Sequence, residues 1–394
     1  MVADMDSSLN PYSPGSGRRP MELAGRQAEI DAFDLLVAIT RHGRHERSLV
    51  LHGLRGVGKT VLLNEFRRQA ERAEFVVVSL EGREAQGGSE AVRAKLGRSL
   101  LQAGRKVNRP GIGGALKRAL GSIASFSAQL GVTGIDIGVE MARGRADSGS
   151  IEVDLEEMVE DLSGALAEKR SALVFLIDEM QDLDHGLLTA LLAVQHQAGQ
   201  RDWPFYVVGA GLPDLPAVLS EARSYAERLF TYRSIGALAP EAAESALVVP
   251  AAKYGATYTP EARDALLAAS GGYPYFIQEY GKAAWDTAPE KTITIDDARI
   301  AIELGRAQLD QGFFLTRWER ATKAEKDYLR LMAQDGDAGS STGDLAERAG
   351  RKQSSMTMTR AALISKGVIY PPALGRVAFT VPGMADYIRR LSDL

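Results

Sequence analysis

The sequence contains no cysteine, and this absence excludes disulfide bonds, thiolate zinc sites and thiol catalysis. Its five histidines are scattered, and none lies at a spacing typical of a metal site. No stretch approaches the roughly 20 consecutive apolar residues that cross a bilayer. The first twenty residues are polar and do not resemble a signal peptide. We therefore expect a cytoplasmic protein with no membrane partner.

A surplus of positive charge is also missing, because 47 Lys and Arg residues face 51 Asp and Glu residues, for a net charge of −4. This balance argues against a protein that coats nucleic acid along its whole surface, but it allows one locally basic domain. A hydrophobic content of 45% is typical of a soluble globular chain. A chain of 394 residues is too long to fold around one ordinary hydrophobic core, so we expect two or three domains.

The N-terminal half reads as a flexible tail followed by an α/β domain. Residues 1–20 are rich in Ser, Pro and Gly, which predicts the tail. Residues 21–235 alternate helical patterns with continuous apolar, β-branched runs, which predicts a doubly wound parallel sheet. Within this domain, residues 97–150 are rich in Gly, Ser and Ala, and we expect a β-hairpin insertion near residues 131–140 flanked by mobile chain.

The C-terminal half reads as helical. Prolines break residues 236–312 into short helices, which predicts a helical lid domain. Residues 313–394 then give three helices and two short strands around the turn at 371–375, the order of a winged helix-turn-helix. Ser341, with Asp344 three residues later, has the spacing of a helix cap at the start of the second of these helices.

One glycine-rich segment matches G-x-x-x-x-G-K-[ST], with an apolar strand before it and a helix after it. Glycines allow consecutive backbone N–H groups to face phosphates, and the helix N-terminus adds its positive dipole end. The lysine would contact the β- and γ-phosphates and the threonine hydroxyl would bind Mg²⁺. We therefore predict a site for ATP or ADP with Mg²⁺. Its residues are Gly53, Leu54, Arg55, Gly56, Val57, Gly58, Lys59 and Thr60, with Val61 next on the helix.

An acidic pair, Asp178 and Glu179, ends the apolar run 173–177. Carboxylates at the end of a buried strand are costly unless they are used. Downstream of the phosphate loop, Asp178 would hold the water shell of Mg²⁺, and Glu179 would act as the base that activates water for attack on the γ-phosphate. The alternative is a strand end that reaches solvent with two hydrated carboxylates.

With these motifs the chain resembles AAA+ ATPases of the origin-recognition and archaeal-initiator type, a group that overlaps the STAND signalling NTPases. Ala24-Gly25-Arg26-Gln27-Ala28-Glu29-Ile30 resembles the box beside the adenine. The resemblance implies that Gly25 and Arg26 shape the base pocket, and that Pro274 in Gly272-Tyr273-Pro274 belongs to the lid turn. It also implies that Arg228 is an arginine finger for the γ-phosphate of a neighbouring subunit, although a surface arginine is an open alternative.

The chain departs from this family at both sensor positions. The end of the fourth strand reads Gly209-Ala210-Gly211-Leu212-Pro213 where a polar sensor is usual, and no arginine follows Pro274 at the lid-sensor position. The resemblance therefore supports nucleotide binding more strongly than turnover. Hydrolysis would be slow, or a partner would supply the missing charge.

The predicted winged helix carries a small positive surplus, because 12 Lys and Arg face 9 Asp and Glu from residue 319 onward. Its candidate contacts to duplex DNA are Arg351, Lys352, Ser355, Arg360 and Arg376. The alternative is a module for packing or protein contacts. Two functions stay open: an ATP-dependent switch that controls DNA binding, and a STAND-like signalling or defence ATPase whose winged helix contacts protein and whose nucleotide state controls self-association. A metabolic kinase is disfavoured, since no acceptor-substrate domain is evident.

Overall fold

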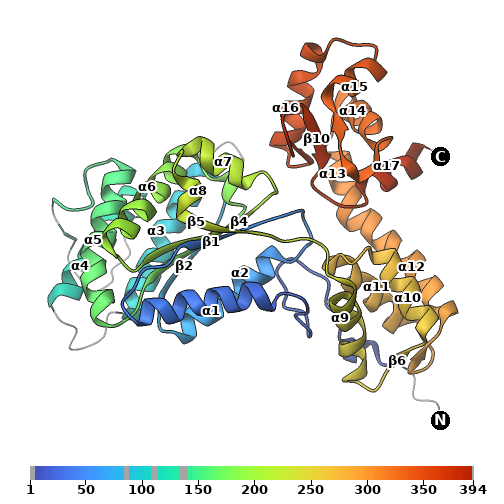
Figure 1. The fold of residues 1–394 in the computed structure, drawn as a ribbon, viewed down its shortest axis with the longest axis horizontal. Coiled ribbons are helices and arrows are strands. Elements are labelled where there is room, and N and C mark those ends of the chain that lie inside the picture. Colours follow the sequence, from blue (N-terminus) through green and yellow to red (C-terminus); the bar gives the residue numbers. More distant parts are fainter. Residues whose placement is uncertain (1–4, 84–87, 108–113, 133–140, 143, 393–394) are drawn as a thin grey trace.

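A computed structural model describes residues 5–83, 88–107, 114–132, 141–142 and 144–392. Its N-terminal α/β domain is joined to a group of helices and then to a small C-terminal domain (Figure 1). In the parts of the chain that the structure describes, no helix combines the length and apolarity needed to cross a membrane.

The predicted parallel sheet is confirmed as five strands in the order β2-β3-β4-β1-β5. They are β1 (Ser48–His52), β2 (Val76–Glu81), β3 (Leu173–Asp178), β4 (Phe205–Gly211) and β5 (Phe230–Ser234). All neighbouring pairs are parallel. Because β4 lies between β1 and β3, the chain reverses its order there, and the carboxyl ends of these strands bound a crevice of the kind in which α/β proteins bind ligands.

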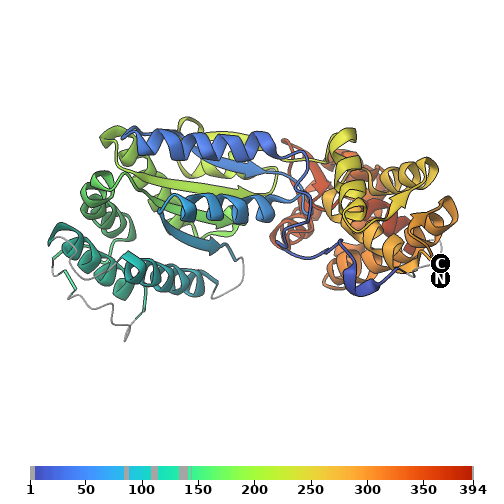
Figure 2. The same cartoon turned by 90° about the horizontal axis from the view of Figure 1, so that it is seen from below.

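Helices cover both faces of the sheet (Figure 2). On one face, α1 (Gln27–Arg41) and α2 (Lys59–Arg72) bury Phe33 and Phe66 against Leu51 and Val174. On the other face, neighbouring strand residues such as Phe175 pack among the remaining helices. Those helices are α3 (Gly88–Val107), α4 (Gly114–Gln129), α5 (Ile151–Glu168), α6 (His185–Arg201), α7 (Leu215–Ala222) and α8 (Ala226–Leu229).

The expectation for residues 97–150 is wrong over much of its length, because α3 and α4 are regular helices there. Leucines and aromatics at helical spacing are buried in the main core, including Leu100 and Phe126. The glycines mark close packing of the helix pair: a Cβ on Gly97 would lie 3.2 Å from the Ser127 carbonyl oxygen, and one on Gly104 would lie 3.2 Å from Leu120. Most of the predicted hairpin, residues 133–140, lies outside the described residues.

The helices after residue 236 form a compact unit with a pair of two-residue parallel strands. Several helices begin at proline, which is suited to the first helical turn, and Thr294 with Asp297 forms a capping box. The elements are α9 (Pro240–Ala252), β6 (Thr257–Tyr258), α10 (Pro260–Ser270), α11 (Pro274–Thr287), β7 (Thr292–Ile293) and α12 (Ile295–Leu309). We refer to this unit, residues 236–309, as the lid.

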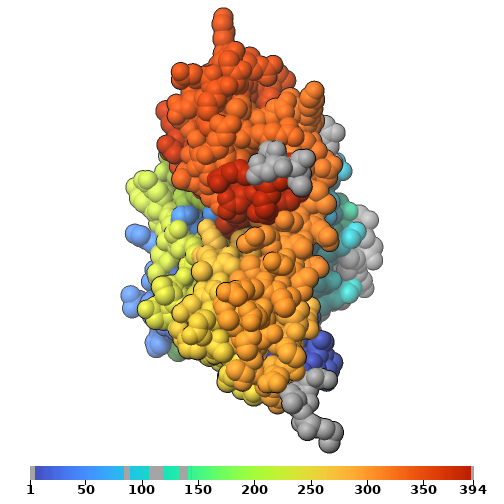
Figure 3. All heavy atoms as spheres, turned by 90° about the vertical axis from the view of Figure 1, so that its right-hand side faces the viewer, coloured from blue at the N-terminus to red at the C-terminus, as the bar shows by residue number. Residues whose placement is uncertain are grey.

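The C-terminal domain begins with a π-helical turn, η3 (Asp310–Phe314), and α13 (Leu315–Glu319). Its three strands pair antiparallel in the order β8-β10-β9. Aromatic contacts from Phe276 through Phe314 to Tyr387 join it to the lid, where the C-terminal helix also lies (Figure 3). The elements are α14 (Lys323–Ala333), η4 (Gly336–Ala338), β8 (Ser340–Ser341), α15 (Thr342–Arg348), η5 (Gln353–Met356), α16 (Thr357–Ser365), β9 (Ile369–Tyr370), β10 (Arg376–Phe379) and α17 (Met384–Ser392).

The prediction of a flexible tail is wrong for residues 5–20, which we call the N-terminal strap. After a short turn, η1 (Ser7–Leu9), Tyr12 is buried in the core of the lid with 3% of its surface exposed. Gly281 on α11 makes this possible, since a Cβ there would lie 2.6 Å from the Tyr12 ring. Composition predicts a tail because Ser, Pro and Gly dominate it, but the buried Tyr12 anchors the segment in the lid.

Candidate functional site

The phosphate loop connects β1 to α2 in a conformation that its glycines permit. Gly56 and Gly58 have φ values of 84° and 96°, which residues with a Cβ rarely adopt. A Cβ on Gly53 would lie 2.0 Å from the Ile235 carbonyl oxygen, so no larger residue fits there. Gly58 is the N-cap of α2, and the loop therefore directs backbone N–H groups and the helix N-terminus at one point.

Lys59 is buried at the centre of this loop, with 7% of its surface exposed. Its Nζ donates to the carbonyl oxygens of Gly53 at 2.8 Å and Leu54 at 2.9 Å. Burial lowers the pKa of Lys59 to about 8, although the carboxylates of Glu179 and Asp178 act in the opposite direction. A phosphate could replace these carbonyl contacts and would stabilise the charged ammonium.

Thr60 and Asp178 meet across the site, where the Thr60 hydroxyl donates to Asp178 Oδ2 at 2.6 Å. Burial raises the pKa of Asp178. A hydroxyl and a carboxylate are hard oxygen donors that suit Mg²⁺. Across the described residues, no group of three or more His, Cys, Asp or Glu side chains could form a metal cage. This pair therefore fits a cation that takes its remaining ligands from water and phosphate.

Glu179 lies directly after β3 in the left-handed region, with φ 46° and ψ 49°, a strained conformation of the kind found at functional sites. Its carboxylate forms an ion pair with Arg55 of the phosphate loop and accepts a hydrogen bond from Gln181 Nε2 at 2.8 Å. Gln181, whose place in the sequence suggests only the start of a helix, belongs to the turn η2 (Met180–Asp182). Gln181 therefore holds the side chain of Glu179 just beyond the carboxyl end of β3.

The glycines at the end of β4 explain the missing polar sensor. A Cβ on Gly209 would lie 2.4 Å from the Met180 sulfur, and one on Gly211 would lie 2.2 Å from Gln181 Oε1. The same Oε1 accepts a hydrogen bond from the Leu212 N–H at 3.2 Å. The amide of Gln181 thus occupies the space beside β4 into which a side chain at position 211 would project.

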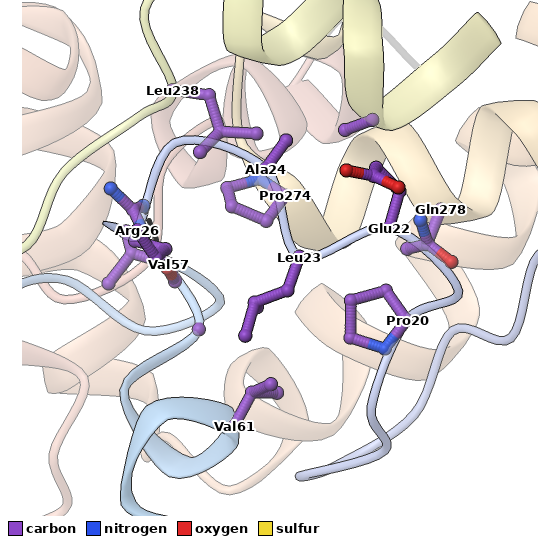
Figure 4. A pocket seen from close by; sticks show the side chains of 12 residues that line it. Pro20, Glu22, Leu23, Ala24, Arg26, Val57, Val61, Leu238, Pro274 and Gln278 are labelled. Atoms are coloured by element: carbon purple, nitrogen blue, oxygen red, sulfur yellow. Dashed lines mark hydrogen bonds between the residues drawn. The ribbon is translucent and has the colours of Figure 1, made fainter. Parts of the chain in front are cut away.

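The residues expected beside the adenine surround a small, mostly apolar pocket, shown in Figure 4 with Leu23, Val61 and Pro274 among its walls. Val57 and Gly58 also line it. Arg26 lines the pocket, whereas the preceding Gly25 is not among its lining residues. Gly25 has φ 66°, and Arg26 donates to the carbonyl oxygens of Val57 at 3.1 Å and Gly236 at 2.5 Å. Burial lowers the pKa of Arg26.

A second cavity of about 330 Å³ adjoins this pocket and contains the phosphate loop and both carboxylates. The lid closes one side, because Pro274 lines both cavities and the Tyr275 N–H donates to the Gly56 carbonyl oxygen at 3.3 Å. The C-terminal domain closes another, because the Arg55 N–H donates to the Thr380 carbonyl oxygen at 2.9 Å.

Arg317 also lines this cavity, and no motif in the sequence identifies it. Its guanidinium lies 4.8 Å from the centre of the Phe313 ring, which stacks on Tyr275 of the lid at 4.9 Å. Burial lowers the pKa of Arg317 to about 10, and the neighbouring Arg55 acts in the same direction. The cavity therefore contains two adjacent guanidinium groups and one lysine beside two carboxylates, an excess of positive charge that suits an anion.

Arg228 is not brought to this cavity. It belongs to α8, which leads into β5, and Phe230 pairs with Ser48 at the start of β1. The phosphate loop follows the C-terminal end of β1. Arg228, which is exposed, therefore lies beside the opposite, N-terminal ends of these strands.

The predicted DNA contacts all lie in the C-terminal domain. Arg351, Lys352 and Ser355 are exposed around η5, and Arg360 is half-buried on α16. Arg376 is exposed on β10, but its guanidinium donates to the Gly339 carbonyl oxygen at 3.1 Å.

Two known protein families match parts of the chain. Residues 22–208 match the AAA ATPase domain family, and residues 311–388 match a domain of unknown function, DUF8462. No curated protein sequence matches. Among solved structures, the Walker-type ATPase PABY2304 of Pyrococcus abyssi is 14% identical with a TM-score of 0.58, covering 97% of this chain and 99% of that one.

Two further structures are similar over most of their length. Cdc6p of Pyrobaculum aerophilum is 16% identical with a TM-score of 0.47, covering 100% of this chain and 99% of that one. The ORC1 protein of Aeropyrum pernix, solved in complex with DNA, is 15% identical with a TM-score of 0.46, covering 94% of each chain. The fold similarity extends beyond the ATPase domain in the Pyrococcus protein, whose whole length is matched.

Proposed function

We propose that this chain is an AAA+ switch that binds and hydrolyses Mg-ATP and whose nucleotide state controls a DNA-binding winged helix. One observation carries the proposal: a single cavity is lined by the phosphate loop, the acidic pair, the lid and the C-terminal domain, through Lys59, Asp178, Glu179, Tyr275 and Arg317. A bound nucleotide would contact all of these units at once.

The arrangement supports hydrolysis by Glu179. Mg²⁺, held by Thr60 and Asp178, would neutralise charge on the β- and γ-phosphates. Glu179 is paired with Arg55, and while this ion pair holds its carboxylate, Glu179 would not act as a base. A γ-phosphate near Arg55 would compete for its guanidinium and release the carboxylate, because a phosphate is the more highly charged acceptor. Glu179, held by Gln181, could then take the proton from the attacking water.

The C-terminal elements support a winged helix, since α14, β8, α15, α16, β9 and β10 follow in the order of that motif, and β9 and β10 flank the turn of the wing. This domain contacts the phosphate loop through Thr380 and the cavity through Arg317. A change from ATP to ADP removes the charge nearest Arg55 and Arg317, and it would thereby change how the domain is docked.

Two measurements on one preparation test the proposal. Calorimetry should give micromolar ATP affinity in the wild type and a loss of about a hundredfold or more in Lys59→Ala, because one buried charge contact to phosphate is removed. Lys169→Ala, which removes an exposed lysine at the end of α5, is the control. Retained micromolar binding in Lys59→Ala would overturn the phosphate-loop assignment.

Fluorescence anisotropy with duplex DNA, with ADP and then with a non-hydrolysable ATP analogue, addresses the switch. We expect salt-dependent binding that differs between the two nucleotides. An absence of salt-dependent binding in both states would remove the DNA part of the proposal.

The contact between Thr380 and the phosphate loop favours a second candidate, a STAND-like signalling ATPase in which the winged helix contacts protein. The fully exposed Leu374 at the tip of the wing and the exposed Met358 on α16 are apolar, which also suits a protein contact. In this case Arg228, at the edge remote from its own site, would act on a neighbouring copy. Light scattering should then show assembly with the ATP analogue and not with ADP, and an unchanging monomer would argue against it.

A further inference from the structure

The N-terminal strap crosses from the lid to the phosphate-binding helix, and both ends of this path are attached. On the lid, Trp285 Nε1 donates to the Asp6 carbonyl oxygen at 3.0 Å. Asn10 Nδ2 donates to Asp286 Oδ1 at 2.9 Å, and the Tyr12 hydroxyl bonds to that of Tyr258 at 2.6 Å. These contacts hold residues 6–12 against the lid, where the N-terminal segment lies in Figure 2.

The second part of the strap contacts α2 at the phosphate site. The Ser13 N–H still contacts the lid, where it donates to Gln278 Oε1 of α11 at 3.1 Å. Four residues later, Asn64 Nδ2 of α2 donates to the Gly17 carbonyl oxygen at 3.1 Å. Gly17 has φ 66°, and a Cβ there would lie 2.9 Å from the Thr60 methyl group. The strap therefore packs directly on the residue that follows Lys59, and a side chain at position 17 would not fit.

Between these attachments, residues 13–18 line the same cavity as the phosphate loop. The Arg18 side chain folds back along the strap, because its Cδ would lie 2.7 Å from a Cβ on Gly15. In the described part of the chain no ion pair involves Arg18, whereas the next residue, Arg19, pairs with Glu65 at 3.6 Å. Arg19 is thus paired with the protein. Arg18 instead lines the cavity of the phosphate loop, with no ion pair among the described residues.

We propose that the strap is a wall of the nucleotide site and that Arg18 contacts the α- and β-phosphates of the bound nucleotide. This inference rests on the proposed function. The position follows from the packing of Gly17 on Thr60, since the first turn of α2 directs its N–H groups at these two phosphates. Arg55 and Arg317, near Glu179, are instead placed for the γ-phosphate. Arg18 would therefore contribute equally to the binding of ADP and ATP.

Titration calorimetry of Arg18→Ala and Arg19→Ala with ADP and with ATP tests this role. We expect Arg18→Ala to weaken the binding of both nucleotides by about tenfold, because one charge-assisted contact that is partly exposed to solvent is lost. Arg19→Ala removes the same charge from the neighbouring position and should stay within about twofold of the wild type. Arg18→Lys should recover part of the lost affinity.

Three results would overturn the inference in different ways. Equal affinities of Arg18→Ala and Arg19→Ala, with tight binding by the wild type, would refute the role of the strap and leave the proposed function intact. A loss of affinity for ATP alone would place Arg18 at the γ-phosphate and refute its assignment to the α- and β-phosphates. A wild type that binds neither nucleotide would refute the proposed function and this inference together.

Hydrogen exchange separates a direct contact from a loosened strap. Saturating ADP should slow exchange of the amides of residues 13–19 by about fivefold or more in the wild type. Arg18→Ala should lose most of this protection while its exchange without nucleotide stays that of the wild type. Equal exchange with and without ADP in the wild type would contradict a strap that contacts the nucleotide.

Discussion

The phosphate site and the outer surface of the C-terminal domain both contain arginine and lysine, but their surroundings differ. At the phosphate site Lys59 is buried, Arg55 is paired with Glu179 and Arg317 stacks on an aromatic ring. On the outer surface Arg351 and Lys352 are exposed to solvent. A buried charge is costly and is tolerated only where it is used, whereas an exposed charge costs almost nothing and has many possible roles.

This difference determines how much each region reveals about function. The cations and carboxylates that line one cavity at the phosphate site suit a polyanion with a metal ion. The exposed charges of the C-terminal domain are compatible with nucleic acid and with protein. Substitutions at the phosphate site should therefore have the larger effects, and the comparison can be tested in that order.

The largest effect is expected for Glu179→Gln. Turnover of ATP should fall by about a hundredfold or more because the general base is lost, while ATP affinity is retained. Affinity could even rise, since Arg55 is freed from its ion pair. Single-turnover hydrolysis and ATP titration on the same variant provide the measurement. Gln181→Ala should reduce turnover less, because it positions Glu179 and does not accept the proton, and unchanged turnover in Glu179→Gln would place the base elsewhere.

An intermediate effect is expected from pH. Burial lowers the pKa of Lys59 to about 8, so we expect its ammonium to lose the proton above that pH unless phosphate stabilises it. Phosphate stabilises the charged form, and binding must then take up a proton. ATP affinity should be constant from about pH 7 to 8 and fall by up to tenfold per pH unit above it.

Calorimetry at about pH 9 in buffers of different ionisation enthalpy measures this proton uptake, which should approach one proton per ATP. Lys59→Arg is the matched control, because arginine stays charged and should remove the pH dependence. Affinity that does not change between about pH 7 and 9 would contradict a Lys59 that titrates in this range.

The smallest effect is expected on the outer surface. If both side chains contact phosphates, Arg351→Ala with Lys352→Ala should weaken binding to duplex DNA by about tenfold. The slope of log affinity against log salt concentration should fall by about two. Arg299→Ala with Lys323→Ala removes two exposed charges elsewhere and is the control. Anisotropy at several salt concentrations measures both quantities, and equal slopes in the two double variants would argue that this surface does not bind DNA.

Several features were predictable because their information is local. Eight consecutive residues specify the phosphate loop, since glycine conformations, the lysine and the helix start are neighbours in the chain. The strands are visible as apolar runs, and the position of Asp178 at a strand end is correct. Composition alone is misleading at two places: it predicts a tail for the strap, and it predicts mobile chain for residues 97–107 and 114–129, which are helical.

The sequence by itself determined the phosphate loop, the acidic pair and the parallel sheet, because each depends on spacing within a few residues. Only the tertiary structure decided which distant side chains complete the site. Arg317 and Gln181 have no local signal, and they lie beside Glu179 because the C-terminal domain docks on the phosphate loop and because glycines leave space at the end of β4. The strap reaches the site for the same physical reason: Tyr12 gains burial only in a core built by helices that lie more than two hundred residues away.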